Sequence, residues 1–355
     1  MRCAMDYDLI VRGGNIADGS GSEIFEGDVA VRADKIVAVG KVAGSAHEEV
    51  DAKGMLVTPG FVDIHTHYDG QATWEERLVP SSWHGVTTTA FGNCGVGFAP
   101  VRSKDRQSLI DLMEGVEEIP GSALHEGLEW DWESFPDYLD ALDRRRHDMD
   151  LCAQLPHAAL RVFVMGERAL KLEDANEEDI ATMRVLAKEA MQAGGFGFTT
   201  SRSLNHMTVQ GDPTPTLKAR EDELTQIAMG LKDAGSGVMQ MIGEFSADDR
   251  HEEISMWQRI VRASGRPLSI TVTQRHRDPN GWKDIKLNLD KDDKAIGGNT
   301  NAMQVEELIE WIENDKESRS SARIAIKTQE IMMAIYESAR KNMIVKLPLR
   351  EKKYP

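Results

Sequence analysis

The first part of the chain alternates short apolar runs with turn residues, a pattern that is typical of β-structure. Residues 6–14 (DYDLIVRGG) read as one strand. Residues 27–40 (GDVAVRADKIVAVG) hold two alternating runs with an Ala-Asp pair between them, which predicts a hairpin. We therefore expect a small β-sandwich part over residues 1–55. No Gly-x-Gly-x-x-Gly run joins a strand to a helix here, so a dinucleotide-binding domain at the N-terminus is disfavoured.

From residue 56 the pattern changes to β-rich runs that alternate with helical ones. The expected strands are residues 55–67, a buried strand candidate, and 85–95, 150–155, 194–201, 237–245 and 266–274. The clearest helix lies within 174–195, where acidic residues crowd the start and Gly194 ends the pattern. Its shared apolar face is formed by Ile180, Met183, Leu186, Ala187, Ala190 and Met191. Strands that alternate with helices predict an α/β protein with a parallel sheet.

The strand–helix units fit an incomplete (β/α)8 TIM-type barrel over residues 56–285, because only six of the eight strands are visible. The segment 100–147 reads as a loop-and-helix insertion above the barrel. Trp130 and Trp132 within it fit either a lid or an acidic amphipathic helix. A barrel that lacks two strands exposes sheet edges, which a homo-oligomer or the C-terminal helices could cover, and poor solubility is the alternative.

The remaining residues, 286–355, read as a polar linker followed by a helical C-terminal tail. The linker includes a Gly-Gly pair and has no apolar pattern. Helices are expected at about 302–314 and 321–341.

Composition excludes several classes of function. The 355-residue chain has a formal net charge of −17 and a pI near 5.1, which disfavours nucleic acid and anionic membranes as partners. It has no apolar stretch of transmembrane length, and its N-terminus lacks a secretory pattern, so we expect a cytoplasmic protein. The three cysteines, Cys3, Cys94 and Cys152, are too few for a disulfide framework in a chain of this size.

Chemistry concentrates in residues 58–71, TPGFVDIHTHYDGQ, where two histidines follow an apolar run. Residues i and i+2 of a strand point to the same face, so His65 and His67 should project together from the C-terminal end of the first barrel strand. Active sites of barrel enzymes lie at that end. Two imidazoles so spaced can bind one divalent ion, usually zinc. A His-x-His pair also occurs at ordinary strand ends, but a core histidine needs no polar loop beside it.

Cys94 ends the second expected strand, which places it beside His65 and His67 in a barrel. A thiolate there could bind or bridge a metal ion. The alternative is an inert buried cysteine at a Gly-rich turn.

Several segments together resemble the N-acyl-D-amino-acid deacylase (D-aminoacylase) group of the amidohydrolase superfamily, over about residues 6–285. They are DLIVRGGNIADGSG, LVTPGFVDIHTHYDGQ, GVTTTAFGNCGVGFAP, GFGFTTSRSLNH and ASGRPLSITVTQRHRDPNGW. The resemblance implies a β-sandwich beside a (β/α)8 barrel, one or two zinc ions, and hydrolysis of the amide bond of small N-acyl-D-amino acids. That makes the chain a hydrolase of carbon–nitrogen bonds other than peptide bonds. By the same resemblance, His65, His67 and Cys94 are metal ligands.

The family's catalytic aspartate, near the last barrel strand in a Gly-Asp-Gly-Gly-Ala-His-like segment, has no match here. Asp278 lies in an expected turn, and the other late aspartates, Asp290, Asp292 and Asp293, lie in the polar linker. The catalytic base therefore stays unassigned. A catalytically inactive truncated or composite remnant that binds metal or self-associates is the alternative to an active hydrolase.

Other polar residues near strand ends are candidates for substrate contact. His206 and Arg202 follow the fourth strand, and Arg202 could pair with a substrate carboxylate. A solvated loop histidine and a surface arginine are the alternatives. His157 follows the third strand, where packing or hydrogen bonding to a ligand residue is the expected role.

Residues of about 302–350 resemble the C-terminal end of Gfo/Idh/MocA-type NAD(P)-dependent oxidoreductases. That stretch holds no catalytic motif, and the dinucleotide fingerprint is absent, so a dehydrogenase is disfavoured. This resemblance indicates a tail of different origin, or else a natural shortening in which tail helices cover the open edge.

Overall fold

The computed structural model describes residues 6–243 and 250–271. The described residues divide into two compact units, one within residues 6–59 and one within residues 60–271. All of the candidate site residues belong to the second unit. The late aspartates and the two tail helices lie outside the described residues, so the statements about them stay predictions.

The described part of the first unit is one five-stranded sheet with the order β3-β2-β1-β4, in which β5 also pairs with β1. Its strands are β1 (Tyr7–Ile16), β2 (Phe25–Arg32), β3 (Lys35–Gly40), β4 (Ala46–Asp51) and β5 (Leu56–Val57). The expected hairpin is present, because β2 and β3 are antiparallel and Ala33 takes a positive φ of 54° at the bend. Ile10 and Ala30 form the buried centre of one face. Within the described residues this part is a single sheet, so the expected β-sandwich stays a prediction.

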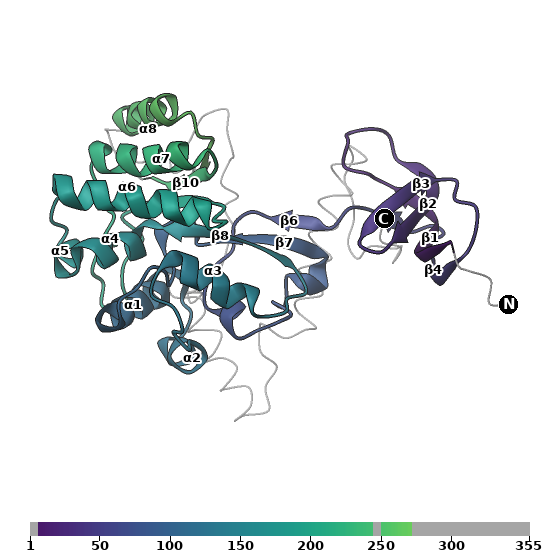
Figure 1. The fold of residues 1–355 in the computed structure, drawn as a ribbon, viewed down its shortest axis with the longest axis horizontal. Coiled ribbons are helices and arrows are strands. Elements are labelled where there is room, and N and C mark those ends of the chain that lie inside the picture. Colours follow the sequence, from purple (N-terminus) through teal and green to yellow (C-terminus); the bar gives the residue numbers. More distant parts are fainter. Residues whose placement is uncertain (1–5, 244–249, 272–355) are drawn as a thin grey trace, which may run out of the picture. The chain divides into compact units, whose positions relative to one another are not determined.

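The second unit is built on a six-stranded parallel sheet whose strands follow chain order from β6 to β11. They are β6 (Phe61–Asp63), β7 (Val86–Phe91), β8 (Asp150–Pro156), β9 (Gly197–Ser201), β10 (Val238–Ile242) and β11 (Leu268–Thr271). Helices connect them, and α6 (Glu177–Gln192), α7 (Glu221–Ala234) and α8 (Arg250–Ser264) lie in a row against the sheet (Figure 1). An incomplete TIM-type barrel is therefore confirmed, with every carboxyl end of the sheet at one edge.

The expectation of one buried strand over residues 55–67 is wrong. The segment divides into β5, which pairs with β1, and the three-residue strand β6. Phe61 and Val62 of β6 are 57% and 62% exposed, whereas Phe198 of β9 is 1% exposed. Among the described strands, β6 lies at the edge of its sheet and pairs with β7 alone, so its apolar side chains lack the cover that inner strands have.

The helices of the second unit cover the sheet and carry the insertion. They are α1 (Arg106–Glu117), α2 (Gly121–Gly127), α3 (Phe135–Asp143), α4 (His157–Met165), α5 (Glu167–Leu170), α6 (Glu177–Gln192), α7 (Glu221–Ala234) and α8 (Arg250–Ser264). Short 3-10 turns occur at Gln71–Thr73, Ser82–His84, Asn93–Gly95 and Ser103–Asp105. The expected acidic start of α6 is reinforced by a capping box between Asn176 and Asp179. None of the helices in the described part of the chain has the length and apolar character that crossing a membrane requires.

The insertion at 100–147 contributes helices α1, α2 and α3, but its tryptophans lie between helices rather than on one. Trp132 is buried, and its Nε1–H donates to the Phe98 carbonyl oxygen at 2.9 Å. Its ring lies 5.1 Å from that of Tyr138, centre to centre. The acidic-helix explanation of Trp130 and Trp132 is therefore wrong. Trp132 joins the insertion to the core of the barrel.

A buried charged cluster joins α4, β9 and α7. Glu223 of α7 accepts from Arg161 Nε at 2.7 Å and from His157 Nε2 at 2.8 Å, while His157 Nδ1 lies 2.8 Å from Thr200 Oγ1. All four side chains are buried. Burial alone would raise the pKa of Glu223, but the hydrogen bonds from His157 and Arg161 hold it at about 2. His157 is thus packed in the core as one of the two expected roles has it, and its hydrogen bonds go to Glu223 and Thr200 rather than to a predicted ligand residue.

We expect Glu223→Ala to lower the free energy of unfolding by about 3–5 kcal/mol, because it leaves the Arg161 charge buried without its partner. Urea denaturation followed by circular dichroism measures this. The control is Glu221→Ala, in the same helical turn, whose ion pair with Arg259 is exposed and should matter far less. Equal losses in the two variants would contradict a stabilising role for the buried cluster.

Candidate metal site

The two histidines lie in the loop that follows β6, not on the strand itself, because β6 ends at Asp63. The loop nevertheless continues alongside β7, since the Thr66 backbone N–H donates to the Ala90 carbonyl oxygen at 2.9 Å. This contact keeps His65 and His67 on one side, with ring centres 5.5 Å apart. The expected convergence of the two rings is therefore present, although a loop produces it.

Cys94 lies in the tight turn Asn93–Gly95 after β7. Its backbone is left-handed, with φ of 55°, and Gly92 and Gly95 also have positive φ. A Cβ on Gly92 would collide with the Gln154 carbonyl oxygen, and one on Gly95 would press against the Thr200 backbone. The glycines thus let the turn pack directly on β8 and β9, which directs the Cys94 side chain toward His65.

A buried polar network supports both loops. Asn93 Nδ2 donates to the Thr66 carbonyl oxygen at 3.1 Å and to the Ala90 carbonyl oxygen at 3.0 Å. Asn93 Oδ1 accepts from Gln154 Nε2 at 2.9 Å. The Cys94 backbone N–H donates to Gln240 Oε1 at 3.1 Å, so a side chain from β10 also holds the turn. The network connects residues of three strand ends, β7, β8 and β10, with the histidine loop.

The side chains of His65, His67 and Cys94 meet at one point. One ligand atom from each lies within 4.8 Å of the others, and His65 Nε2 is 3.2 Å from Cys94 Sγ. His65 is exposed and Cys94 is buried, so the cluster is open on one side. Imidazole nitrogen together with thiolate sulfur is a ligand set that suits zinc and related soft divalent ions. The structure brings these three predicted residues together.

Burial shapes the charges of the site. It lowers the pKa of His67 to about 3, with His65 and His206 adding repulsion, and it lowers that of His206 to about 4. Both rings are thus neutral near pH 7 and keep a lone pair for a metal ion or a proton. Burial raises the pKa of the Cys94 thiol, with Glu117 and Asp69 adding to the rise. Thiolate formation at Cys94 therefore needs a compensating positive charge.

Two carboxyl groups near the cluster were missed by the analysis of the sequence. Asp69 is fully buried, and burial raises its pKa to about 8. Glu117, at the end of α1, lies with Oε1 3.1 Å from His67 Nε2, and burial raises its pKa to about 7. Asp69 has a sequence signal, because it follows the His-x-His pair by two residues. Glu117 has none, since it comes from the insertion.

The two residues predicted to contact substrate lie at and after the end of β9. His206 Nδ1 lies 2.8 Å from Ser201 Oγ, and its ring interacts electrostatically with both His65 and His67. Arg202 Nε donates to both oxygens of Glu253, at 2.9 and 3.1 Å, and another of its nitrogens donates to the Ala219 carbonyl. His206 thus lies beside the group of His65, His67 and Cys94, whereas Arg202 already has an acidic partner.

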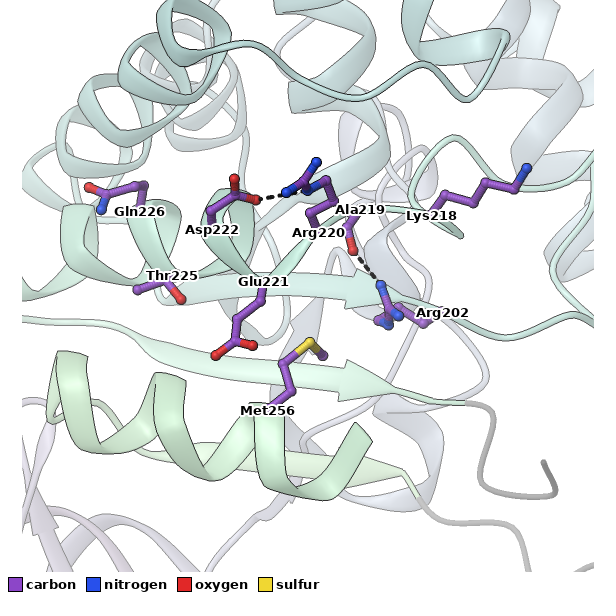
Figure 2. A pocket seen from close by; sticks show the side chains of 9 residues that line it. All are labelled: Arg202, Lys218, Ala219, Arg220, Glu221, Asp222, Thr225, Gln226 and Met256. Atoms are coloured by element: carbon purple, nitrogen blue, oxygen red, sulfur yellow. Dashed lines mark hydrogen bonds and ion pairs between the residues drawn. The ribbon is translucent and has the colours of Figure 1, made fainter. Parts of the chain in front are cut away.

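Arg202 also lines an open cavity of about 710 Å³ at the start of α7 (Figure 2). Lys218 and Arg220 contribute further positive charge to its wall, and Glu221 and Asp222 contribute negative charge. The three residues of the metal cluster do not line this cavity. The cavity therefore does not mark the candidate metal site, which is formed by His65, His67 and Cys94.

Comparison with known proteins points to one family. Residues 48–329 match the model of the amidohydrolase family, so the match continues past residue 285. The D-aminoacylase of Alcaligenes xylosoxydans xylosoxydans is 30% identical over 276 residues, which cover 78% of this chain and 51% of that protein. The chain thus spans about half the length of this curated relative.

Comparison with solved structures points to the same family. A D-aminoacylase structure, described for the functional role of its binuclear metal centre, aligns with a TM-score of 0.61 and 29% identity. The alignment covers 74% of this chain and 51% of the chain of the D-aminoacylase structure. The N-acyl-D-glutamate deacylase from Bordetella bronchiseptica, complexed with zinc and a phosphonate inhibitor, aligns with a TM-score of 0.55 and 27% identity, covering 74% and 50%.

We expect Asn93→Ala to lower the free energy of unfolding by about 2 kcal/mol, because buried carbonyl groups and the Gln154 amide lose their partner. Thermal and urea denaturation measure this loss. Asn205→Ala, at an exposed position in the loop after β9, is the control and should change stability by under about 0.5 kcal/mol. A neutral Asn93→Ala would mean that the network contributes little to the fold.

A second expectation concerns Cys94 in protein kept in chelator. Because its thiol pKa is raised, little thiolate exists at pH 8, and iodoacetamide should label Cys94 at least about tenfold more slowly in folded than in urea-unfolded protein. Labelling of the folded protein should still increase above pH 9, where an ordinary thiol levels off. Peptide mass spectrometry measures both rates. A plateau below pH 9 would show that the thiol is not perturbed.

Proposed function

Because the chain belongs to the amidohydrolase family, we propose that it hydrolyses the amide bond of N-acyl-D-amino acids at a metal centre held by His65, His67 and Cys94. The observation that carries this proposal is the convergence of these three side chains from two consecutive strand ends. The relatives support the substrate class, since both are deacylases of N-acyl-D-amino acids by name. We propose zinc as the metal, in one or two ions.

The residues present fit a divalent ion. His67 Nδ1 is buried without a hydrogen-bond partner, which is costly unless something else satisfies it. The lowered pKa of His67 keeps its ring neutral, so no proton competes for the lone pair near pH 7. Cys94 must release its proton when it becomes a ligand, and a nearby cation offsets the burial that raises the thiol pKa. When bound, zinc polarises a substrate carbonyl and lowers the pKa of a water molecule.

We further propose that His206 and Arg202 contact the substrate. His206 is held by Ser201 beside the cluster, where a neutral ring can donate to or accept from a polar group of the substrate. Arg202, which follows β9 directly, offers a guanidinium that can pair with a substrate carboxylate. Glu253 competes for Arg202, so a substrate carboxylate would have to share or displace that ion pair.

The general base stays unassigned in this proposal, because Asp278 and the linker aspartates lie outside the described residues. A cytoplasmic location and self-association stay predictions from the sequence. The substrate is a small molecule, as it is for the relatives that the chain resembles.

Elemental analysis and amidase assays test the proposal. We expect purified protein to hold about one to two equivalents of zinc and to release acetate from N-acetyl-D-amino acids but not from the L-isomers. His65→Ala should weaken metal binding by about a hundredfold or more and lower kcat/KM by about a thousandfold, since several kcal/mol of stabilisation are lost. His125→Ala, at an exposed position on α2, is the matched control and should leave both unchanged.

The two readouts separate the outcomes. Zinc bound through His65 without D-specific hydrolysis would leave a metal-binding protein that is not a deacylase. Metal content that is the same in wild type and His65→Ala would contradict the site itself.

A further inference from the structure

We propose that Thr199 of β9 is a positioning residue of the metal site, acting through the turn that carries Cys94. Its hydroxyl group holds this turn on both sides of Cys94, which fixes the thiol where a metal ion can share it with His65 and His67. The inference deepens the proposed function and rests on it.

The turn that carries Cys94 has an unusual backbone. Gly92, Cys94 and Gly95 take positive φ values of 82°, 55° and 71°. A glycine adopts this region freely, but a residue with a Cβ does so at a cost and persists there only where its surroundings hold it. Cys94 is therefore in a conformation that the rest of the structure must maintain. In that conformation its Sγ lies 3.2 Å from His65 Nε2.

Thr199 supplies such a restraint with a single hydroxyl group. Its Oγ1 accepts from the Gly95 backbone N–H at 3.1 Å and donates to the Gly92 carbonyl oxygen. A hydroxyl has one hydrogen and two lone pairs, so both hydrogen bonds can exist at once. The side chain is fully buried, so water does not readily replace a hydrogen bond that is lost there. One side chain therefore closes the turn across Cys94.

The neighbouring strand adds to this hold. Gln240 of β10 is the register partner of Thr199 in the parallel sheet, so the two side chains lie on the same face. Gln240 Oε1 accepts from the Cys94 backbone N–H at 3.1 Å. Two consecutive N–H groups of the turn, those of Cys94 and Gly95, are thus bound by side chains from two strands. Thr199 also binds the Gly92 carbonyl at the start of the turn, which is why the proposal falls on Thr199.

Thr200, the next residue of β9, is the matched control. It is also fully buried, but successive side chains of a strand point to opposite faces. Its hydroxyl lies 2.8 Å from His157 Nδ1, in the buried charged cluster. Loss of the Thr200 hydroxyl would therefore remove a buried hydrogen bond of the same strand without removing one from the cysteine turn.

Hydrogen–deuterium exchange tests the hold on the turn in protein kept in chelator. Thr199→Val keeps the shape of the side chain but removes its hydroxyl, so the backbone N–H groups of residues 93–96 should exchange about tenfold faster. Thr199→Ser keeps a hydroxyl and should stay within about threefold of wild type. Thr200→Val should leave the exchange of these residues unchanged. Peptide mass spectrometry measures the exchange, and circular dichroism checks that each variant is folded.

Cobalt titration tests the consequence for the site without relying on turnover, because a thiolate bound to Co²⁺ gives a charge-transfer absorption in the near ultraviolet. We expect Thr199→Val to weaken Co²⁺ binding about 10- to 100-fold, the loss typical of removing a group that orients a metal ligand. The absorption per bound ion should also fall. Thr199→Ser should lose less than about threefold, and Thr200→Val should bind Co²⁺ as wild type does.

The outcomes separate the inference from the proposed function. Wild-type Co²⁺ affinity or wild-type exchange in Thr199→Val would overturn the inference. Equal losses in the Val and Ser variants of Thr199, or an equal loss in Thr200→Val, would overturn it as well, because the hydroxyl at this position would then have no particular role. A wild-type protein that binds no Co²⁺ would instead overturn the proposed metal centre, and the inference with it.

Discussion

The hydrogen bonds of the Asn93 side chain are the constraint on which the geometry of the site depends. One buried amide joins the Thr66 carbonyl, between the two histidines, to the β7 end and to Gln154 of β8. A parallel sheet alone brings strand ends to one edge, but it does not fix how the loops beyond them sit. Asn93 supplies that second restraint, because it is the neighbour of Cys94 in sequence and of the histidine loop in space. Any other conformation of these loops would break hydrogen bonds of a buried amide, which costs free energy.

The same packing controls the electrostatics. Gly92 and Gly95 let the cysteine turn approach β8 and β9 closely, which removes water from Cys94, Asp69 and Thr199. Water exclusion then lowers the pKa of His67 and raises those of Cys94, Asp69 and Glu117. Every one of these shifts favours the uncharged form. Close packing of the cysteine turn thus contributes both to the geometry of the site and to the raised pKa of Cys94.

The sequence predicted the parts that depend on local pattern. β-branched and apolar runs located all six parallel strands, and the acidic start and Gly194 located α6. The prediction of a buried strand at 55–67 was wrong because burial depends on having neighbours on both sides, and β6 has one among the strands that the structure describes. Trp130 and Trp132 were ambiguous for a similar reason, since only the fold shows that Trp130 packs on the Phe98 ring and that Trp132 donates to the Phe98 carbonyl oxygen. Glu117 could not be predicted, because no spacing rule connects the end of an inserted helix to a histidine fifty residues earlier.

The metal cluster and the turnover chemistry place different demands on the barrel. The cluster needs β6 and β7 for its three side chains, with β8, β9 and β10 holding the cysteine turn through Gln154, Thr199 and Gln240. All of these lie within the described sheet, so the convergence of the three side chains rests on strands β6 to β10. Proton transfer to a leaving amine would need a further group, which the resemblance to the D-aminoacylase group places near the last barrel strand. The proposed metal affinity and the proposed hydrolysis therefore depend on different residues, and a measured difference between them would point to the general base rather than to His65, His67 or Cys94.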